Sequence, residues 1–373
     1  MEFKNLQLED VIVLEDKKRK PLSTMDRSKR KGIYPYYGAQ EIIDSIDDYI
    51  FDGKYILLAE DGENLKSRKK DLVKIVEGKF WLNNHAHIFK VKENVDLEYL
   101  YYYLLKLDLG EYITGSTQPK LNQENMNKIK IKLPELKIQR KISKILSNID
   151  GKIKLNNEIN NNLYDLGKSY FEDFISNCDR EVAIKDIANE VLDYTKNKND
   201  KVKLLNSSDV TENIFPKVEF VDNKDLKGHF KKRFKKHDIL YSQIRPRNHH
   251  YGYVLLDDSE NYLASTRFMV VRNKKEKVSS SLLYYYLTSK NAVEDFTTKT
   301  ELRSGTFPQG NYEDLSSYVV KYSSNQESIT KILDLILETI NNNNNENEKL
   351  SQLRDTLLPK LMNGEIDLDN IEI

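Results

Sequence analysis

The sequence predicts an α+β protein in which two tandem α/β domains are separated by two long antiparallel coiled-coil helices, with pseudo-two-fold symmetry. Three observations predict this architecture: an internal repeat, two long segments with heptad spacing of apolar residues, and short apolar runs bounded by turn residues elsewhere. A chain of 373 residues also suits two or three domains, at roughly 100–200 residues for each.

The composition excludes several classes of protein. Hydrophobic residues make up 39% of the chain, and there is a single cysteine, Cys178, so a disulfide framework is excluded. No apolar run approaches the ~18 residues that span a bilayer, and the first residues contain no apolar signal core. We therefore expect a cytoplasmic protein.

The internal repeat is visible in the residues themselves. The run Leu-Tyr-Tyr-Tyr-Leu at Leu100–Leu104 returns at Leu283–Leu287, 183 positions later, and Ile56-Leu57 returns at the same offset. Downstream, a second set returns 187 positions later: Gln139, Ile142, Lys144, Ile145, Leu146, Ile149 and Ile153 reappear as Gln326, Ile329, Lys331, Ile332, Leu333, Ile336 and Ile340. The chain is therefore a diverged tandem duplication.

Each half has the same internal order. A mixed region with short apolar runs such as Tyr55–Leu58 and Phe268–Val271, which are typical of strands, precedes a helical segment. The expected boundaries are residues 1–133 for the first domain, 134–176 for a central spacer helix, 177–322 for the second domain, and 323–373 for a distal spacer helix with a C-terminal tail.

The two helical segments show heptad spacing. The first stripe comprises Ile138, Ile142, Ile145, Ile149, Lys152, Asn156, Ile159, Leu163, Leu166 and Tyr170, and the second comprises Ile329, Ile332, Ile336, Thr339, Asn343, Glu346, Leu350, Leu353 and Leu357. Steps of three and four residues between apolar positions indicate a coiled coil. Asn156 and Asn343 occupy equivalent places, where a polar residue fixes the register.

Two alternatives concern these helices. Each helix could instead pack only on its own domain, but a helix of about 35–40 residues is ~55 Å long, more than one domain covers. The asparagine run Asn341–Asn345 could be a disordered linker. Its heptad context favours a helix that continues through it.

Charge is unevenly distributed along a chain with 59 basic and 59 acidic residues. Residues 17–31 contain eight Lys or Arg against one acidic residue, and residues 227–250 show the same ratio. Each half thus has one basic segment, with aromatic and amide side chains close by. Lys and Arg neutralise phosphates, and Arg, Asn and Gln form paired hydrogen bonds with base edges. The repeated basic segments favour DNA binding, although each alone would suit a solvated loop.

Motifs for catalysis are weak. His85 and His87 flank Ala86 on an expected strand, but no carboxylate or cysteine partner follows them, so we expect no metal site. Asp61 with Glu77 and Lys79 resembles a nuclease arrangement, in which carboxylates hold a metal and a lysine polarises water. The second half has no counterpart, and we expect no catalytic residues.

The order of these segments resembles the specificity subunit of type I restriction–modification systems. The motifs that are similar to this family are Tyr36-Tyr37-Gly38, Tyr49–Gly53, Tyr55–Leu58, Glu60-Asp61-Gly62, Asn84–His87, Gly115–Leu121, Leu133-Pro134 with Gln139, and the C-terminal stretch Leu357–Ile366. The second half departs from the pattern, because Ser323–Gln326 lacks the proline and Gly305–Gln309 only approximates the Gly-x-x-Gln-Pro segment.

The resemblance implies two target-recognition domains that read a bipartite, asymmetric DNA site. It further implies a chain that is not catalytic and binds no cofactor itself. Its partners would be double-stranded DNA, two methyltransferase (modification) subunits and restriction (translocase/nuclease) subunits, which use S-adenosylmethionine, ATP and magnesium. Two other hypotheses remain: a helical adaptor that binds no DNA, and a stand-alone nuclease.

The candidate residues follow from the basic segments and the resemblance. For DNA binding they are Lys20, Arg30, Lys31, Tyr36, Gln118, Lys120, Lys232, Arg233, Arg245, Arg247, Asn248 and Arg303. For helix pairing they are Ile142, Ile145, Ile149, Asn156, Leu163, Ile329, Ile332, Ile336, Asn343 and Leu350.

Overall fold

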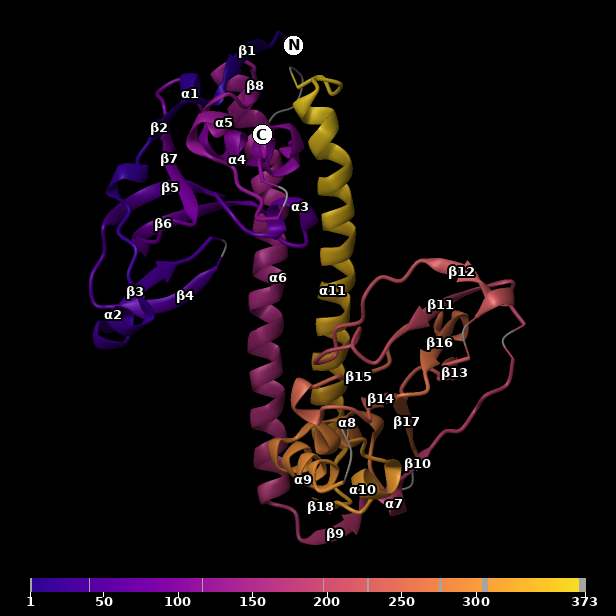
Figure 1. The fold of residues 1–373 in the computed structure, drawn as a ribbon. Helices are drawn as coiled ribbons and strands as arrows, with labels where there is room; N and C mark the ends of the chain where they lie inside the picture. Colours follow the sequence, from indigo (N-terminus) through magenta and orange to yellow (C-terminus); the bar gives the residue numbers. More distant parts are fainter. Residues whose placement is uncertain are drawn as a thin grey trace. The chain divides into compact units, whose positions relative to one another are not determined.

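The computed structural model describes residues 2–39, 41–115, 117–196, 198–226, 228–274, 277–303 and 308–368 (Figure 1). Gln40, Ser116, Lys227 and residues 305–307, which belong to segments named above, lie outside the described residues. The chain forms two compact units: unit 1 comprises residues 1–152 and 350–373, and unit 2 comprises residues 153–349. In the described ranges, every helix is too short or too polar to cross a membrane.

Unit 1 contains the first mixed region. Its strands are β1 (Lys4–Gln7), β2 (Ile12–Leu14), β3 (Lys31–Tyr37), β4 (Ile42–Ile46), β5 (Phe51–Ala59), β6 (Val73–Leu82), β7 (Ala86–Val91) and β8 (Lys130–Leu133). Its helices are α1 (Leu8–Val11), the 3₁₀ helix η1 (Asp16–Lys18), α2 (Thr24–Lys29), α3 (Asn64–Ser67), α4 (Leu97–Lys106), η2 (Gly110–Tyr112) and α5 (Gln123–Asn127).

The main sheet of unit 1 has six strands in the order β2-β7-β5-β6-β3-β4. Strand β5 pairs antiparallel with both β6 and β7, and its residues Tyr55–Ala59 are all buried because helices cover one face and a second apolar cluster covers the other. The small sheet β1-β8 brings the two ends of the mixed region together. The end of β5 is therefore a rigid platform for the residues that follow it.

Unit 2 contains the second mixed region. Its strands are β9 (Arg180–Ala183), β10 (Ala188–Glu190), β11 (Lys201–Leu205), β12 (Phe220–Asp222), β13 (Phe230–Lys232), β14 (Ile239–Ser242), β15 (Tyr251–Tyr253), β16 (Tyr262–Ser265), β17 (Phe268–Asn273) and β18 (Val319–Tyr322). Its helices are α7 (Ile184–Ile187), η3 (Asn223–Asp225), η4 (Pro246–Asn248), η5 (Ser259–Asn261), α8 (Ser280–Thr288), α9 (Lys290–Glu301) and α10 (Tyr312–Ser316). The sheets are β10-β17-β14-β15, β12-β11-β16-β13 and β18-β9.

The duplication is preserved in individual hydrogen bonds. The repeated Leu-Tyr-Tyr-Tyr-Leu runs lie in α4 and α8, whose N-caps are Asp96 and Ser279. The Oε1 atom of Gln139 accepts a hydrogen bond from the backbone N–H of Asp96 at 2.9 Å. The Oε1 atom of Gln326 accepts the equivalent bond from Ser279 at 3.2 Å. The repeated glutamine thus connects each long helix to the cap of the same shorter helix.

Two long helices complete the fold: α6 (Leu136–Ser176) and α11 (Glu327–Met362). The asparagine run lies inside α11, which confirms that the helix continues through it. Within unit 1, Arg354 Nη1 donates to Asp150 Oδ1 at 2.8 Å. Within unit 2, Asn156 Nδ2 donates to Asn347 Oδ1 at 2.8 Å, and Asn343 Nδ2 donates to Asn160 Oδ1 at 2.8 Å. Ascending numbers on α6 meet descending numbers on α11, so the helices pair antiparallel, as predicted.

The seam between the helices differs from a continuous apolar stripe. In unit 2 it is a ladder of side-chain amides, here called the amide ladder: Asn156, Asn157, Asn160, Asn343, Asn344 and Asn347. Several residues of the predicted stripes are exposed instead, namely Ile159, Leu166, Tyr170 and Leu353. The physical reason is that paired amides occupy the seam, which leaves these apolar side chains on another face.

The remaining seam candidates divide between the two units. The structure places Ile142 and Ile149 in the interior of unit 1, and Ile329 and Ile336 in the interior of unit 2. Four others are partly buried: Ile145, Leu163, Ile332 and Leu350. In unit 1, Ile142 and Leu146 of α6 share a core with Leu358 and Leu361 of α11. Each unit therefore uses residues of both helices in its core.

Two glycines of α6 give a matched test of this packing. A Cβ atom on Gly167 would lie 2.1 Å from Oη of the buried Tyr285, whereas a Cβ atom on Gly151 would meet nothing within 4 Å. We expect Gly167→Leu to lower the free energy of unfolding by about 1–3 kcal/mol through overpacking. Gly151→Leu should not lower it, because it removes a glycine from an exposed helix position. Denaturant unfolding of both variants measures the difference, and equal stabilities would contradict the close contact.

Candidate nucleic-acid interface

The first basic segment surrounds α2 and the start of β3. Lys20 is exposed, and its carbonyl accepts a hydrogen bond from Trp81 Nε1 at 2.6 Å. Arg30 forms an ion pair with Asp47 at 2.9 Å, and its guanidinium lies over the Trp81 ring, 5.0 Å from the centroid. Lys31 forms an ion pair with Asp44 at 2.6 Å. These cations face solvent, but carboxylates of β4 and the turn after it partly neutralise two of them.

Tyr36, unlike these cations, is inaccessible to solvent. Its ring is fully buried in a small cluster with Ile46 and Trp81, and its Oη accepts a hydrogen bond from the backbone N–H of Leu22 at 2.9 Å. The side chain therefore supports the fold of unit 1 and is not available to a ligand at this surface. Hydrogen bonding to the backbone satisfies its hydroxyl, as is usual for a buried tyrosine.

Gln118 and Lys120 lie on a tight loop beside the end of β5. Gly115, which precedes the loop, has a backbone φ of +85°. Residues with a side chain rarely adopt this left-handed conformation, so the position favours glycine. The backbone N–H groups of Thr114 and Lys120 donate to each other's carbonyl oxygens, both at 2.8 Å. The backbone N–H of Leu121 donates to the Glu60 carbonyl at 2.8 Å. Both candidate side chains are exposed on this fixed backbone.

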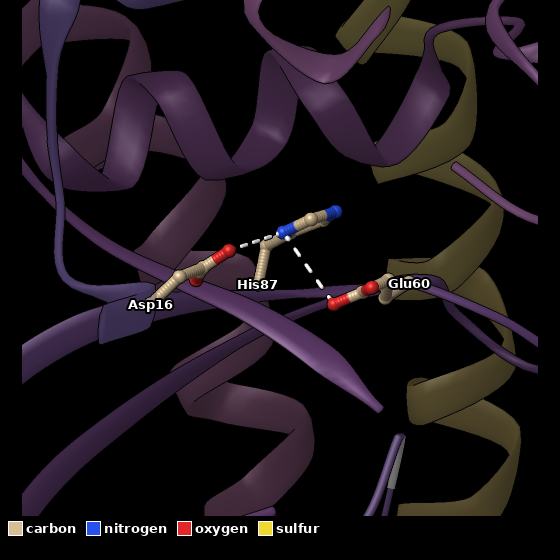
Figure 2. Close-up of side chains that lie close together, drawn as sticks. All are labelled: Asp16, Glu60 and His87. Atoms are coloured by element: carbon tan, nitrogen blue, oxygen red, sulfur yellow. Dashed lines mark hydrogen bonds and ion pairs between the residues drawn. The ribbon is translucent and has the colours of Figure 1, made fainter. Parts of the chain in front are cut away.

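Four charged residues lie together beneath this loop, and we call them the buried charge cluster: Asp16, Arg19, Glu60 and His87. Figure 2 shows three of them, which come from η1, the end of β5 and β7 and point toward one another. His87 Nδ1 lies 2.6 Å from Asp16 Oδ2, and His87 Nε2 lies 2.8 Å from the Leu121 carbonyl. Both ring nitrogens of His87 thus have oxygen partners.

Arg19 completes the buried charge cluster. Its Nη1 lies 2.7 Å from Glu60 Oε2 and 2.6 Å from the Ala86 carbonyl, and its Nη2 lies 3.2 Å from Asp16 Oδ2. Both carboxylates therefore pair with the guanidinium of Arg19. Burial opposes ionisation of Glu60, but the hydrogen bond from Arg19 and the charge of His87 outweigh it and hold the pKa of Glu60 below its usual value.

Sequence reasoning gave His87 no carboxylate partner, and the structure corrects this. Asp16, Glu60 and His87 offer ligand atoms within 4.8 Å of one another, an arrangement that could hold a metal ion. However, Arg19 donates to the same carboxylate oxygens that would bind the ion. A guanidinium in this position repels a second cation, so the residues present do not fit a metal site.

The nuclease arrangement is not assembled as one group in the described residues. Asp61 accepts a hydrogen bond from His85 Nδ1 at 2.9 Å and bridges to the backbone of Lys120. Glu77 lies on β6, paired across the sheet with Lys54, and Lys79 lies over the Tyr49 ring at 4.6 Å. The candidate metal-binding group contains none of these carboxylates.

The second basic segment is divided by the fold of unit 2. Arg245, Arg247 and Asn248 are exposed on a turn around η4, directly after β14, where Arg245 has a left-handed backbone with φ of +49°. Arg247 forms an ion pair with Glu301 at 3.2 Å. Arg303, also exposed, forms an ion pair with Asp314 at 2.8 Å. The turn therefore brings Arg245, Arg247 and Asn248 together.

Lys232 and Arg233 lie apart from this turn, on and after β13. Lys232 is 3% exposed, and its Nζ donates to the Phe268 carbonyl at 2.6 Å and pairs with Glu190 at 3.0 Å. Lys232 is thus an interior residue in this structure and is not available to a ligand. Arg233 is partly exposed.

In both units, a loop forms backbone hydrogen bonds with the residues that follow a central strand. In unit 1, Leu121 donates to the carbonyl of Glu60, and Asp61 bridges to Lys120. In unit 2, Gly310 donates to the carbonyl of Gln243 at 2.9 Å, and Ile244 bridges to Gln309. Each unit thus fastens a loop to the chain that leaves an equivalent strand, β5 or β14.

Comparisons with known proteins match both halves. The family model for the type I restriction modification DNA specificity domain matches residues 1–164 and 180–352. The type I restriction enzyme HindI specificity subunit of Haemophilus influenzae is 36% identical over 184 residues, which cover 48% of this chain and 39% of that protein. A putative type I restriction enzyme specificity subunit of the same organism is 34% identical over 139 residues, which cover 37% of this chain and 35% of that protein. The chain thus aligns with well under half the length of either relative.

A solved structure extends the likeness over nearly the whole chain. The crystal structure of the type I restriction–modification S subunit from M. genitalium covers 97% of this chain and is itself covered to 96%, with a TM-score of 0.67. The sequence identity is 14%, so the likeness shows the fold alone.

Proposed function

We propose, on the premise that this chain belongs to the type I restriction–modification DNA specificity family, that it reads the two halves of a bipartite, asymmetric DNA site. It would position methyltransferase and restriction subunits on that site and carry no active site of its own. The observation that carries the proposal is the duplication: each unit fastens a loop to an equivalent strand end, with exposed cations beside it.

The exposed side chains suit contacts with both parts of DNA. In unit 1, Lys20 and Lys120 provide cations for phosphates, and Gln118 provides an amide for a base edge. In unit 2, Arg245 and Asn248 provide groups that form paired hydrogen bonds with guanine and adenine. Two units of this kind support the reading of two half-sites, one by each.

The helices offer a surface for the partner subunits. Leu155, Ile159, Leu166 and Tyr170 are 37–51% exposed and lie within about 60° of one another around α6, at 100° for each residue. An exposed apolar stripe of this kind suits helices of the methyltransferase subunits. Those partners would use S-adenosylmethionine, and the restriction subunits would use ATP and magnesium. This chemistry on DNA implies a cytoplasmic location.

Domain exchange tests the proposed function. Residues 1–133 would be replaced by the matching region of another specificity subunit, and methylated motifs would be mapped in cells that also contain the methyltransferase partner. We expect one half-site to change completely and the other to stay the same, because each unit reads its own half. A motif altered in both halves, or no methylation with the unaltered chain, would contradict the proposal.

The alternative of an adaptor without DNA binding has one observation in its favour. Arg30, Lys31, Arg247 and Arg303 already have carboxylate partners, which reduces their attraction for phosphates. Surface ion pairs are worth about 0–1 kcal/mol, so phosphates can displace these carboxylates.

The salt dependence of DNA binding separates the two functions. We expect the triple variant Arg245→Met, Arg247→Met and Arg303→Met to flatten the slope of log affinity against log salt by up to about three. Lys349→Met, at an exposed position of α11, should leave the slope unchanged. Fluorescence anisotropy with a duplex at several salt concentrations measures both. No binding of the duplex by the unaltered chain would favour the adaptor, and equal slopes would show that these three arginines do not contact phosphates.

A further inference from the structure

The loop of residues 117–121, here called the reading loop, has the properties of a preorganised contact element. Its backbone is held at the C-terminal end, where Lys120 pairs with Thr114 and the N–H of Leu121 donates to the carbonyl of Glu60. The backbone N–H of Gly62 also donates to the Pro119 carbonyl at 3.3 Å. Among the described residues the side chain of Gln118 has no hydrogen-bond partner, although the backbone around it is fixed. A free amide on a fixed backbone loses little entropy when it binds.

The buried charge cluster lies directly against the reading loop. His87 Nε2 donates to the Leu121 carbonyl at 2.8 Å, and Lys120 Nζ lies 3.2 Å from Glu60 Oε1. Arg19 bonds the same glutamate from the other side. The position of the reading loop therefore depends on His87, Glu60 and Arg19. No sequence motif contains all three residues.

Unit 2 shows that the fold does not require this cluster. Leu58 pairs with His87 in unit 1, and Tyr241 pairs with Met269 in the equivalent position of unit 2. Met269 is fully buried, and Gln243 stands where unit 1 has Glu60. Both units keep the backbone hydrogen bond between the loop and the strand end. Unit 1 adds the buried charge cluster, whereas unit 2 has the apolar residue Met269 in place of His87. The buried charge cluster thus distinguishes unit 1 from unit 2.

We propose that Gln118 contacts a base edge in the half-site of unit 1, that Lys120 contacts a neighbouring phosphate, and that His87, Glu60 and Arg19 are positioning residues for both. This inference rests on the proposed function and deepens it. The amide of glutamine matches the N6 and N7 atoms of adenine in the major groove, so the base is expected to be an adenine. Lys120 exchanges Glu60 for a phosphate when DNA binds.

The test maps methylated motifs in cells that contain the methyltransferase partner and variants of the full chain. Gln118→Ala should reduce discrimination at one position of one half-site by about 5- to 150-fold. His87→Met, which copies the residue of unit 2, should relax the same position and leave the other half-site unchanged. The double variant should relax it no further, because His87 acts through Gln118.

Two controls separate positioning from general stability. Tyr99→Phe removes a hydrogen bond from the core of unit 1 to the Lys132 carbonyl and should leave every position of the motif specified. Gly115→Ala acts at the exposed edge of the loop, where a Cβ atom would lie 2.3 Å from the Gln118 carbonyl oxygen. It should relax the same position as Gln118→Ala, even if His87→Met does not fold.

The outcomes are distinguishable. If Gln118→Ala and Gly115→Ala leave all positions specified, the reading loop does not contact bases and the inference is overturned. If His87→Met weakens methylation without relaxing that position, as Tyr99→Phe could, its role is structural only. If the unaltered chain directs no methylation, the proposed function fails and the inference fails with it.

Discussion

Lys232→Met is expected to lower the free energy of unfolding of unit 2 by about 3–5 kcal/mol. The side chain is 3% exposed, and its ammonium group neutralises Glu190 and donates to the Phe268 carbonyl. Methionine fills a similar volume but leaves a carboxylate without its partner and a buried carbonyl without a donor. Lys231→Met, at the exposed neighbouring position, should change stability by less than about 0.5 kcal/mol.

A double variant identifies the cause of this loss. Lys232→Met combined with Glu190→Leu removes both charges, and replacing a buried pair by apolar residues is often neutral. We therefore expect the double variant to recover most of the stability, as measured by denaturant unfolding. If the double variant were as unstable as Lys232→Met, the loss would come from packing and not from the unpaired charge. A stable Lys232→Met variant with weakened DNA binding would restore Lys232 to the interface.

Inserting one heptad into both long helices is expected to lengthen the gap between the two half-sites by about three base pairs. The amide ladder places Asn156 opposite Asn347 and Asn160 opposite Asn343, so insertions after Asn162 in α6 and after Ile340 in α11 lie opposite each other. Seven residues add ~10 Å of helix, and one base pair rises ~3.4 Å. The bases recognised in each half should stay the same.

The rate of methylation should fall, because three base pairs turn the half-sites by about 100° around a duplex of ~10.5 base pairs per turn. The measurement is again the methylated motif in cells. A four-residue insertion after Asn162 alone is the control: it shifts the part of α6 that follows the amide ladder relative to α11 and should reduce stability. An unchanged gap in an active complex that carries both heptads would show that the helices do not set the spacing.

The repeat was the most informative part of the sequence. The runs at Leu100 and Leu283 correctly indicated the duplication and lie in α4 and α8, and the heptads correctly located α6 and α11. Such patterns are readable because helical periodicity is a local property. Three residues of the predicted stripe, Ile159, Leu166 and Tyr170, are exposed, because a stripe defined by spacing alone does not show which face meets the partner helix.

The sequence alone did not predict which charged residues are buried. Lys232 lies among seven other cations in its segment, and only the position of β13 next to Phe268 and Glu190 makes it interior. The buried charge cluster was equally hidden, because Asp16 and His87 are 71 residues apart and meet only through strand pairing. The DNA-contact residues remain predictions, and the structure narrows them to the exposed members.

The division of the chain into units has a consequence for its synthesis on the ribosome. Unit 2 is one continuous segment, but the core of unit 1 includes Leu358, Leu361 and Leu368. About 200 residues separate the two segments of unit 1. At 5–20 residues per second, the N-terminal segment waits roughly 10–40 s for the residues that close its core. The unit that begins first is therefore completed after unit 2, and nascent chains expose its apolar surface until Leu358, Leu361 and Leu368 have been synthesised.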